Sequence, residues 1–201
     1  MFDRFLRPLI DRPLAVAGRG LASTGLPANA VTVTGLAVGL LAVPALAAQR
    51  YELALLAVLL NRLCDGLDGA VARRKGLTDF GGYIDIVADM IFYGAVVFGF
   101  VLADPANGVA AGLLLVSFMG TSASFLAFGI LAAKRGLQTD ALGRKSFFYS
   151  TGLIEGSETA AFLVVVCLLP QHFAVLAFAF AALCGLTVAQ RIVVAWRSFR
   201  Q

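Results

Sequence analysis

Residues 65–89 read DGLDGAVARRKGLTDFGGYIDIVAD, and this stretch carries four aspartates: Asp65, Asp68, Asp85 and Asp89. A carboxylate at the centre of a membrane helix costs at least about 2.5 kcal/mol, so acidic residues in such helices normally face a bundle interior or a wet cavity and mark function. The sequence on both sides is strongly apolar. We therefore interpret residues 65–89 as the turn between two membrane helices and as the place where the chain does its chemistry.

The composition is that of a membrane protein. The chain has 201 residues, of which 60% are hydrophobic and only 14% are charged, and its mean hydropathy is +0.88. A helix that spans a bilayer needs about 20 mainly apolar residues. We predict an all-α polytopic membrane protein with six transmembrane helices, at residues 30–48, 52–73, 82–103, 108–133, 147–169 and 173–195.

The connections between these segments are short, so consecutive helices should be antiparallel neighbours in one bundle. We expect a single membrane domain over residues 1–201, made of an N-terminal segment (1–25) and the six-helix bundle (26–201). In the N-terminal segment, apolar residues recur at helical spacing opposite charged ones, which indicates a short helix lying in the membrane interface. A partly ordered tail is an equal alternative because Pro8 and Pro13 interrupt the segment.

The basic residues predict the orientation, because Lys and Arg are enriched in cytoplasmic loops close to the membrane. Fourteen of the 16 fall in the N-terminal segment, the second connection, the fourth connection and the C-terminal end, all on one side of the predicted bundle. We therefore expect both termini and the aspartate-rich turn on the cytoplasmic side. A net charge of +4 fits a protein pressed against anionic lipid headgroups, and nothing in it indicates nucleic-acid binding.

The helical repeat brings the four carboxylates together. At about 100° per residue, the motif residues of the first helix fall within an arc of roughly 140°; they are Asp65, Asp68, Gly69, Ala72 and Arg73. Gly81, Asp85 and Asp89 likewise share one face of the next helix, and the short loop forces the two helices side by side.

Four carboxylates packed closely would repel one another unless a cation lay among them. Oxygen ligands without Cys or His suit hard ions such as Mg²⁺ or Mn²⁺. Four carboxylates are enough for two ions, the arrangement that stabilises both ends of an in-line phosphoryl displacement. Metal-dependent phosphoryl chemistry is the leading interpretation.

Small residues around the aspartates support a ligand site. Gly66, Gly69, Ala70 and Ala72 remove bulk from the first helix, and Arg73 could place a bidentate cation beside phosphate oxygens. The alternative is that the small residues serve close helix packing and the neighbouring arginines only neutralise the aspartates. Gly35 and Gly39 form a further pair that allows two helices to approach closely.

The pattern Asp65-x2-Asp68-Gly69-x2-Ala72-Arg73-x7-Gly81-x3-Asp85-x3-Asp89 resembles the signature of the CDP-alcohol phosphotransferases, integral membrane enzymes of phospholipid synthesis. All eight signature positions are present, and the six predicted spans and the chain length are also similar. The segments NRLCDGLDGAVARRKGLTDFGG and KSFFYSTGLIEGSET more narrowly resemble a YnjF-like bacterial inner-membrane branch. The resemblance implies transfer of a substituted phosphate from a CDP-linked lipid, such as CDP-diacylglycerol, to an alcohol, with release of CMP.

The resemblance also implies roles for single residues. Asp65, Asp68 and Asp85 would hold Mg²⁺ or Mn²⁺, two ions in all, and the donor diphosphate. Asp89 would bind the second ion and take the proton from the acceptor hydroxyl. Other residues would contact the CDP-lipid: Gly69, Ala72, Arg73, Gly81 and Thr78.

The stretch Pro27-Ala28-Asn29-Ala30-Val31-Thr32 resembles a family Pro-Asn-x-x-Thr element that precedes the first span, although Ala28 here separates the proline from the asparagine. Asn29 and Thr32 are therefore candidate CDP contacts. Capping of the first helix by Asn29 is an equal alternative.

The acceptor is the open question. Glu155 and Glu158 lie in the fifth predicted span. Members of the family it resembles that accept a phosphorylated alcohol often carry extra cations beside such glutamates, so their absence here favours a neutral polyol or an amino alcohol. Glycerol 3-phosphate or inositol phosphate is the alternative, since Arg144, Lys145 and Arg191 could line the acceptor side. Pairing of the two glutamates with Arg144 or Lys145, to fix helix register, is also open.

A transporter also places acids in membrane helices, but transport sites commonly lie at the bilayer midplane between repeated halves, and this chain has no repeat. A catalytically silent scaffold is a third possibility, disfavoured by the intact set of aspartates. The resemblance further implies a homodimer. We expect a lateral opening toward lipid, because the acyl chains of the donor must remain in the bilayer while its nucleotide reaches the polar site. We expect a multi-pass protein of the bacterial inner membrane.

Overall fold

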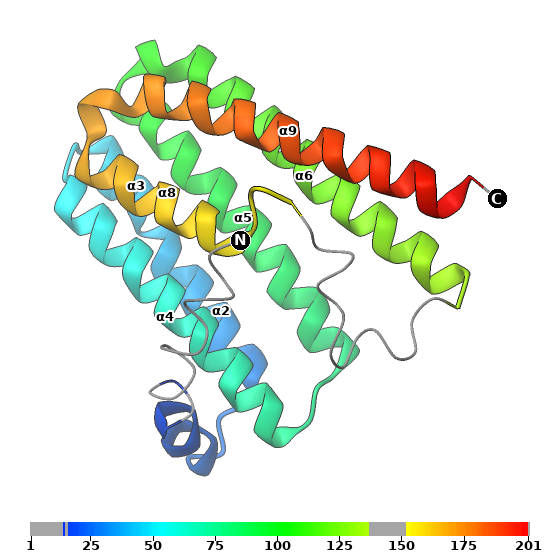
Figure 1. Cartoon of the computed structure of the whole chain (residues 1–201). Helices are drawn as coiled ribbons and strands as arrows, with labels where there is room; N and C mark the ends of the chain where they lie inside the picture. The colour runs from blue at the N-terminus through cyan, green and yellow to red at the C-terminus, as the bar shows by residue number, and fades with distance from the viewer. Residues whose placement is uncertain (1–13, 15, 137–151, 201) are drawn as a thin grey trace.

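The computed structural model describes residues 14, 16–136 and 152–200, and the described part contains helices but no strands. The long helices run obliquely between the upper left and the lower right of Figure 1. The labelled α-helices are, in chain order, α2 (Ala28–Leu40), α3 (Ala42–Ala47), α4 (Tyr51–Lys75), α5 (Asp79–Ala103), α6 (Gly108–Lys134), α8 (Gly156–Leu168) and α9 (Phe173–Phe199). Short 3₁₀ turns at Pro105–Asn107 and Pro170–His172 precede α6 and α9.

The prediction of an all-α membrane protein is confirmed. Four helical segments are long and apolar enough to cross a membrane: Ala28–Ala47, Asp79–Ala103, Pro105–Lys134 and Pro170–Phe199. Helix α8 is a shorter apolar helix of 13 residues. Helix α4 has 25 residues, but its second half carries the charged motif. The predicted count of six spans is therefore not confirmed.

One predicted boundary was wrong. The fifth predicted segment, 147–169, is helical only from Gly156 among its described residues, and its first part lies outside them. The first predicted segment, 30–48, agrees with the span Ala28–Ala47, but a break at Leu41 divides it into α2 and α3. Pro44 explains the break, because proline has no N–H to donate to the carbonyl of Leu40, four residues earlier.

Local sequence fixes the turn that carries the motif. Helix α4 ends in three basic residues, which interact favourably with the negative end of the helix dipole, and Gly76 follows with a φ of 106°. The next helix begins at once, because the Thr78 hydroxyl accepts a hydrogen bond of 3.0 Å from the Gly81 amide. This short connection holds the end of α4 beside the start of α5.

Glycines bring α2 against the motif helices. A Cβ on Gly35 would lie 2.6 Å from the Cβ of Cys64 on α4, and one on Gly39 would lie 2.7 Å from the ring of Phe92 on α5. The close approach predicted for this glycine pair is thus present. Deeper in the bundle, Phe100 of α5 stacks on Phe173 of α9 with ring centroids 4.4 Å apart.

A short helix at residues 16–23 packs on the outside of α4. A Cβ on Gly18 would lie 2.6 Å from that of Ala70, and one on Gly66 would lie 2.7 Å from a methyl group of Leu14. Gly66 and Ala70 therefore serve helix packing, the alternative to a ligand role. The apolar residues that predicted an interfacial helix, Phe2 to Ile10, lie outside the described residues.

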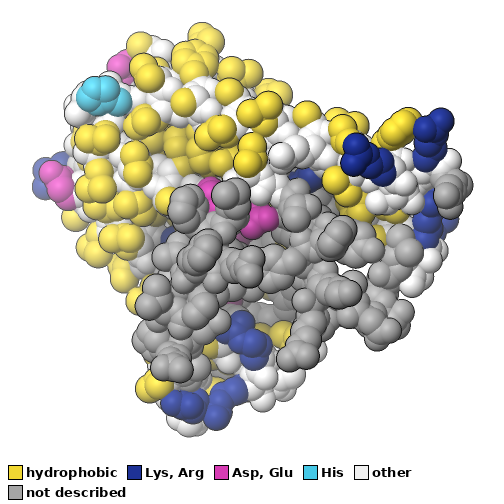
Figure 2. Space-filling view, in the orientation of Figure 1, with side chains coloured by type: hydrophobic (Ala, Val, Ile, Leu, Met, Phe, Trp, Pro, Cys, Tyr) yellow, Lys and Arg dark blue, Asp and Glu magenta, His cyan; other side chains and the backbone are white. Residues whose placement is uncertain are grey.

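Most helix ends that carry basic residues lie on one side of the molecule; the exception is Arg50, at the start of α4. The start of α2, the α4–α5 turn and the ends of α6 and α9 lie toward the bottom and right of Figure 1, whereas the loops before α6 and α9 lie at the upper left. In the same view, hydrophobic side chains cover the surface over α8 and the first half of α9, and most visible Lys and Arg side chains lie along the lower and right edges (Figure 2).

Candidate active site: a carboxylate cluster beside a pocket

Three of the four aspartates form one cluster. Asp65 and Asp68 project from α4 and Asp85 from α5, and one carboxylate oxygen from each lies within 4.8 Å of the other two. Asp68 is buried, and the other two are partly buried. An all-oxygen set of this kind fits a hard divalent cation such as Mg²⁺ or Mn²⁺. The residues present therefore fit the predicted metal.

Thr32 of α2 orients the buried member of this cluster. Its hydroxyl lies 2.7 Å from Oδ2 of Asp68, and both side chains are less than 10% exposed. Thr32 was predicted to contact CDP; in the structure its hydroxyl is engaged by Asp68. Hydrogen bonds of this kind fix the orientation of a ligating carboxylate.

The fourth aspartate, Asp89, has different partners. Arg62 Nη2 donates to Oδ1 of Asp89 at 2.7 Å, and the hydroxyl of Tyr93 donates to Oδ2 at 3.1 Å. Asp89 is not a member of the three-residue cluster found among the described residues. Arg62 joins the two parts, because its Nη1 also lies 3.7 Å from Oδ2 of Asp65.

Asn61 and Tyr93 are site residues that the sequence reasoning missed. Asn61 accepts from Arg62 Nε at 2.9 Å and donates to the carbonyl of Gly35 at 2.8 Å. Both residues gave a usable signal: Asn61 is polar within an apolar run, and Tyr93 follows Asp89 by one helical turn.

The residues predicted to contact the CDP-lipid lie around the α4–α5 turn. Arg73 reaches back over Gly69, since a Cβ on that glycine would lie 3.2 Å from Nη1 of Arg73. A Cβ on Gly81 would lie 2.9 Å from the Thr78 hydroxyl and 3.2 Å from Oδ1 of Asn29, which brings these three residues together. Ala72, on α4, is half-buried.

Capping by Asn29 is not observed. Pro27 occupies the N-cap position of α2, and no side chain caps this helix. Asn29 lies inside the first turn instead. Its side chain is directed toward the start of α5, as the distance to Gly81 requires.

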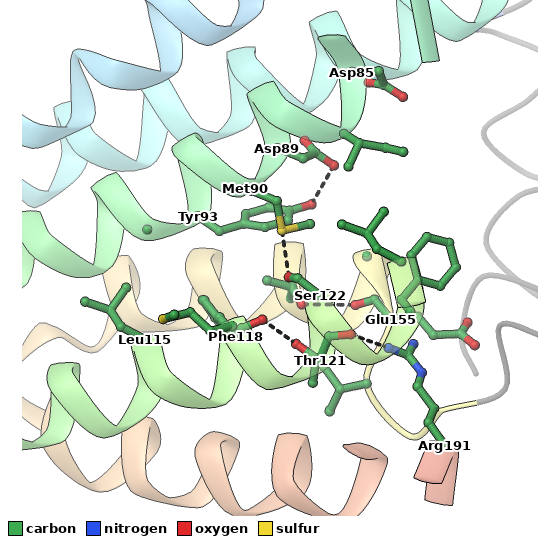
Figure 3. Close-up of a pocket in the computed structure, with 18 residues that line it drawn as sticks. Asp85, Asp89, Met90, Tyr93, Leu115, Phe118, Thr121, Ser122, Glu155 and Arg191 are labelled. Atoms are coloured by element: carbon green, nitrogen blue, oxygen red, sulfur yellow. Dashed lines mark hydrogen bonds between the residues drawn. The ribbon is translucent and has the colours of Figure 1, made fainter. Parts of the chain in front are cut away.

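A pocket of about 590 Å³ opens beside the carboxylates. Asp85, Asp89 and Tyr93 line one wall, from α5, and Thr121 and Ser122 of α6 line the facing wall (Figure 3). Much of the remaining lining is apolar; it includes Ile86, Met90, Leu115, Phe118, Phe125 and Ile154. The pocket thus places an open volume against two of the four motif aspartates.

Glu155 and Arg191 lie at the end of the pocket away from Leu115 (Figure 3). Arg191 is buried, donates from Nη1 to the carbonyl of Thr121 at 2.7 Å and lies over the ring of Phe125. Its buried Nε has no hydrogen-bond partner among the described residues.

The two glutamates form a capping box at the start of α8. Glu155 is the N-cap, and its side chain accepts from the backbone N–H of Glu158, whose carboxylate accepts from the Glu155 N–H at 3.0 Å. Glu155 thus caps α8 and Glu158 lies in its first turn, so both glutamates stand at the start of this apolar helix. Arg144 and Lys145, proposed to pair with them or to line the acceptor side, lie outside the described residues.

Comparison with known proteins agrees with this geometry. Residues 26–190 match the family described as CDP-alcohol phosphatidyltransferase. The inner membrane protein YnjF of Escherichia coli is 48% identical over 193 residues, covering 96% of this chain and 94% of that protein. The archaetidylinositol phosphate synthase of Pyrococcus horikoshii is 32% identical over 140 residues, covering 65% of this chain and 74% of that protein.

Solved structures of the phosphatidylinositol phosphate synthase PgsA1 of Mycobacterium tuberculosis are also similar. The complex with bound CDP-DAG has a TM-score of 0.71 at 26% identity, covering 92% of this chain and 94% of that one. The complex with manganese and citrate has a TM-score of 0.69 at 26% identity, covering 91% and 88%. The family match, the relatives and the carboxylate cluster agree, and the chain belongs to the CDP-alcohol phosphatidyltransferase family.

Proposed function

We propose that this protein transfers a phosphatidyl group from a CDP-linked lipid such as CDP-diacylglycerol to the hydroxyl of a small alcohol and releases CMP. One observation carries the proposal: Asp85 belongs both to the three-carboxylate cluster and, with Asp89, to the wall of the pocket. A metal-bound donor phosphate and an acceptor hydroxyl would therefore meet at these two residues. The solved relative with bound CDP-DAG supports a donor of this class.

Asp65, Asp68 and Asp85 would hold Mg²⁺ or Mn²⁺, which when bound neutralises the negative charge of the donor diphosphate. Arg73 lies over Gly69 and would add a fixed cation beside the same phosphates. Asn29, Thr78 and Gly81, which lie together at the start of α5, would contact the rest of the CDP group. A second ion requires Asp89 as a ligand in addition to its bonds with Arg62 and Tyr93.

Asp89 would act as the general base. Its carboxylate accepts the proton of the acceptor hydroxyl, and the hydroxyl oxygen attacks the phosphorus attached to the lipid. The bond from this phosphorus to the CMP oxygen breaks, and CMP leaves with the electron pair. Asp89 is suited to this step because it lines the pocket beside Asp85.

The acceptor we favour is a non-phosphorylated alcohol, either a neutral polyol or an amino alcohol. Glu155 lies in the pocket near Arg191, and a carboxylate accepts hydrogen bonds from hydroxyl or ammonium groups. The second candidate is a phosphorylated alcohol such as inositol phosphate or glycerol 3-phosphate. It is favoured by the Nε of the buried Arg191, which has no hydrogen-bond partner within residues 16–136 and 152–200, and by relatives named for inositol phosphate lipids.

The test is CMP release by the purified protein in vesicles that contain CDP-diacylglycerol, with one alcohol of each class supplied in turn. We expect turnover that requires Mg²⁺ or Mn²⁺, stops with EDTA and is fastest with a polyol or amino alcohol. Inositol phosphate or glycerol 3-phosphate as the best acceptor would overturn the acceptor assignment but leave the reaction class intact. An active-site control, Asp68→Asn, should release no CMP with any acceptor.

Absence of CMP release with every acceptor and both metals would favour the two other classes of function, a transporter or a silent scaffold. For the cellular setting, we infer a multi-pass protein of the bacterial inner membrane with its termini and site on the cytoplasmic side. The relative described as an inner membrane protein supports the location. We also infer a homodimer from the family resemblance.

A further inference from the structure

Arg62 lies between the two halves of the aspartate group and is mostly enclosed. Its side chain is 17% exposed, and its guanidinium lies over the rings of Phe92 and Tyr93, with centroids 4.9 and 5.0 Å away. An arginine that only neutralised charge at a surface would not need to be mostly enclosed and to lie over two aromatic rings. Asn61 fixes its position, because the Asn61 Oδ1 accepts hydrogen bonds from both Nε and Nη2 of Arg62.

Each oxygen of Asp89 has its own donor. Oδ1 accepts from Arg62, on α4, and Oδ2 accepts from the hydroxyl of Tyr93, on α5. The same tyrosine oxygen accepts from Nη1 of Arg62 at 2.8 Å, so the three groups close a ring of hydrogen bonds. A carboxylate held at both oxygens has little freedom to rotate.

The ring of hydrogen bonds is anchored to a third helix. Asn61 Nδ2 donates to the carbonyl of Gly35 on α2, and Asn61 is 95% buried. The chain of contacts therefore runs from the α2 backbone through Asn61 and Arg62 to Asp89. Tyr93 is itself buried and lines the pocket together with Asp89.

We propose that Arg62 and Tyr93 are positioning residues that fix the Asp89 carboxylate toward the acceptor hydroxyl. The inference rests on the proposed function, in which Asp89 is the base. Neither residue touches the reacting atoms in this scheme; both act through Asp89. Such supporting hydrogen bonds typically contribute about 10- to 100-fold to activity, since small errors in the position of a reacting group are costly.

The test compares Tyr93→Phe and Arg62→Lys with the wild-type protein in the CMP-release assay. Tyr93→Phe removes one oxygen and keeps the buried ring, so we expect kcat to fall about 10- to 100-fold while the KM for the CDP-lipid changes less than about threefold. Arg62→Lys keeps the charge but not the two-pronged contact, so it should retain more activity than Arg62→Met. The combined variant should lose less than the product of the two single losses, because both residues act on one carboxylate.

Tyr51→Phe is the matched control, since Tyr51 also packs against a phenylalanine but lies at the opposite end of α4 from the motif. It should keep wild-type kcat. Mn²⁺ affinity and the thermal unfolding temperature, measured on each variant, distinguish a positioning role from a structural one. The inference requires both quantities to stay near their wild-type values in Tyr93→Phe.

If the wild-type protein releases CMP and Tyr93→Phe has the same kcat, the inference is overturned and the proposed function stands. A loss of kcat that is matched by loss of Mn²⁺ binding or of thermal stability also overturns it, in favour of a structural role. A wild-type protein that releases no CMP overturns the proposed function, and this inference with it.

Discussion

Asp89 combines two properties at the scale of a single residue: its carboxylate is bound by two donors, and it still lines the pocket. The three clustered aspartates have a different environment, in which the oxygens face one another. Four residues of one type thus divide into a group suited to hold a cation and a single carboxylate suited to accept a proton.

The first prediction at this scale concerns the base. Asp89→Asn should lower kcat by at least about 10³-fold, since an amide cannot accept the proton, and should largely spare CDP-lipid binding. Turnover is measured as CMP release, and donor binding by titration with a CDP-lipid in the presence of Mn²⁺. Asp79→Asn, an exposed aspartate in the first turn of the same helix, is the control and should remain active. Full activity of Asp89→Asn would exclude the general-base assignment.

The aspartates themselves could be predicted because charge in an apolar run is conspicuous and its helical spacing is regular. The hydrogen-bond partners of each aspartate could not be predicted in the same way. Asp89 contacts Arg62 and Tyr93, and a helical wheel does not show which of several nearby carboxylates an arginine will contact.

At the scale of the helices, the close packing of α2 against α4 and α5 determines which side chains meet at the site. Gly39 is one point of close approach, because a Cβ there would meet Phe92 at 2.7 Å and the amide nitrogen of Asn61 at 2.8 Å. These two side chains surround Arg62, one by stacking and one by hydrogen bonds. The glycine therefore allows the network that holds Asp89 to form.

Gly39→Ala should destabilise the protein by about 1 to 3 kcal/mol, the usual range for an added methylene in a packed core. The measurement is thermal unfolding in detergent. Gly112→Ala on α6 is the matched control, because a Cβ there meets nothing within 4 Å and alanine favours a helix over glycine by about 0.5 to 1 kcal/mol. Equal unfolding temperatures for the two variants would show that the α2 contact is looser than the structure indicates.

The helix boundaries show where local patterns stop being sufficient. Residues 147–169 look like one apolar segment, yet Glu155 and Glu158 start a new helix at Gly156 through a capping box. The pattern Glu-x-x-Glu lacks the serine or threonine of the usual motif, so composition favoured a continuous span. Pro44 gave a clearer signal for the break between α2 and α3.

At the scale of the whole molecule, the helices separate basic ends from the opposite loops (Figure 1). The predicted cytoplasmic side includes the α4–α5 turn and the end of α9, and the other side includes the connections before α6 and α9. In this predicted orientation the aspartate-rich α4–α5 turn faces the cytoplasm.

Single cysteines test the orientation in a variant whose three native cysteines are replaced. Ala106→Cys and Gln171→Cys, in exposed loops on one side, should react with a membrane-impermeant thiol reagent in intact cells. Leu77→Cys and Arg200→Cys should react only after the membrane is permeabilised. The reverse pattern would mean that the basic ends face outward, against the bias that orients most membrane proteins.

The sequence by itself determined the membrane class and the aspartate motif, because hydropathy and helical spacing are local properties that survive in any packing. The resemblance of that motif to a known signature indicated the reaction family. Only the tertiary structure decided which three carboxylates cluster, that Asp85 and Asp89 line the pocket, and that Arg62 and Tyr93 contact Asp89. These features arise from contacts among α2, α4, α5 and α6, and they depend on helix orientation and close approach. No single segment of the chain encodes those distances.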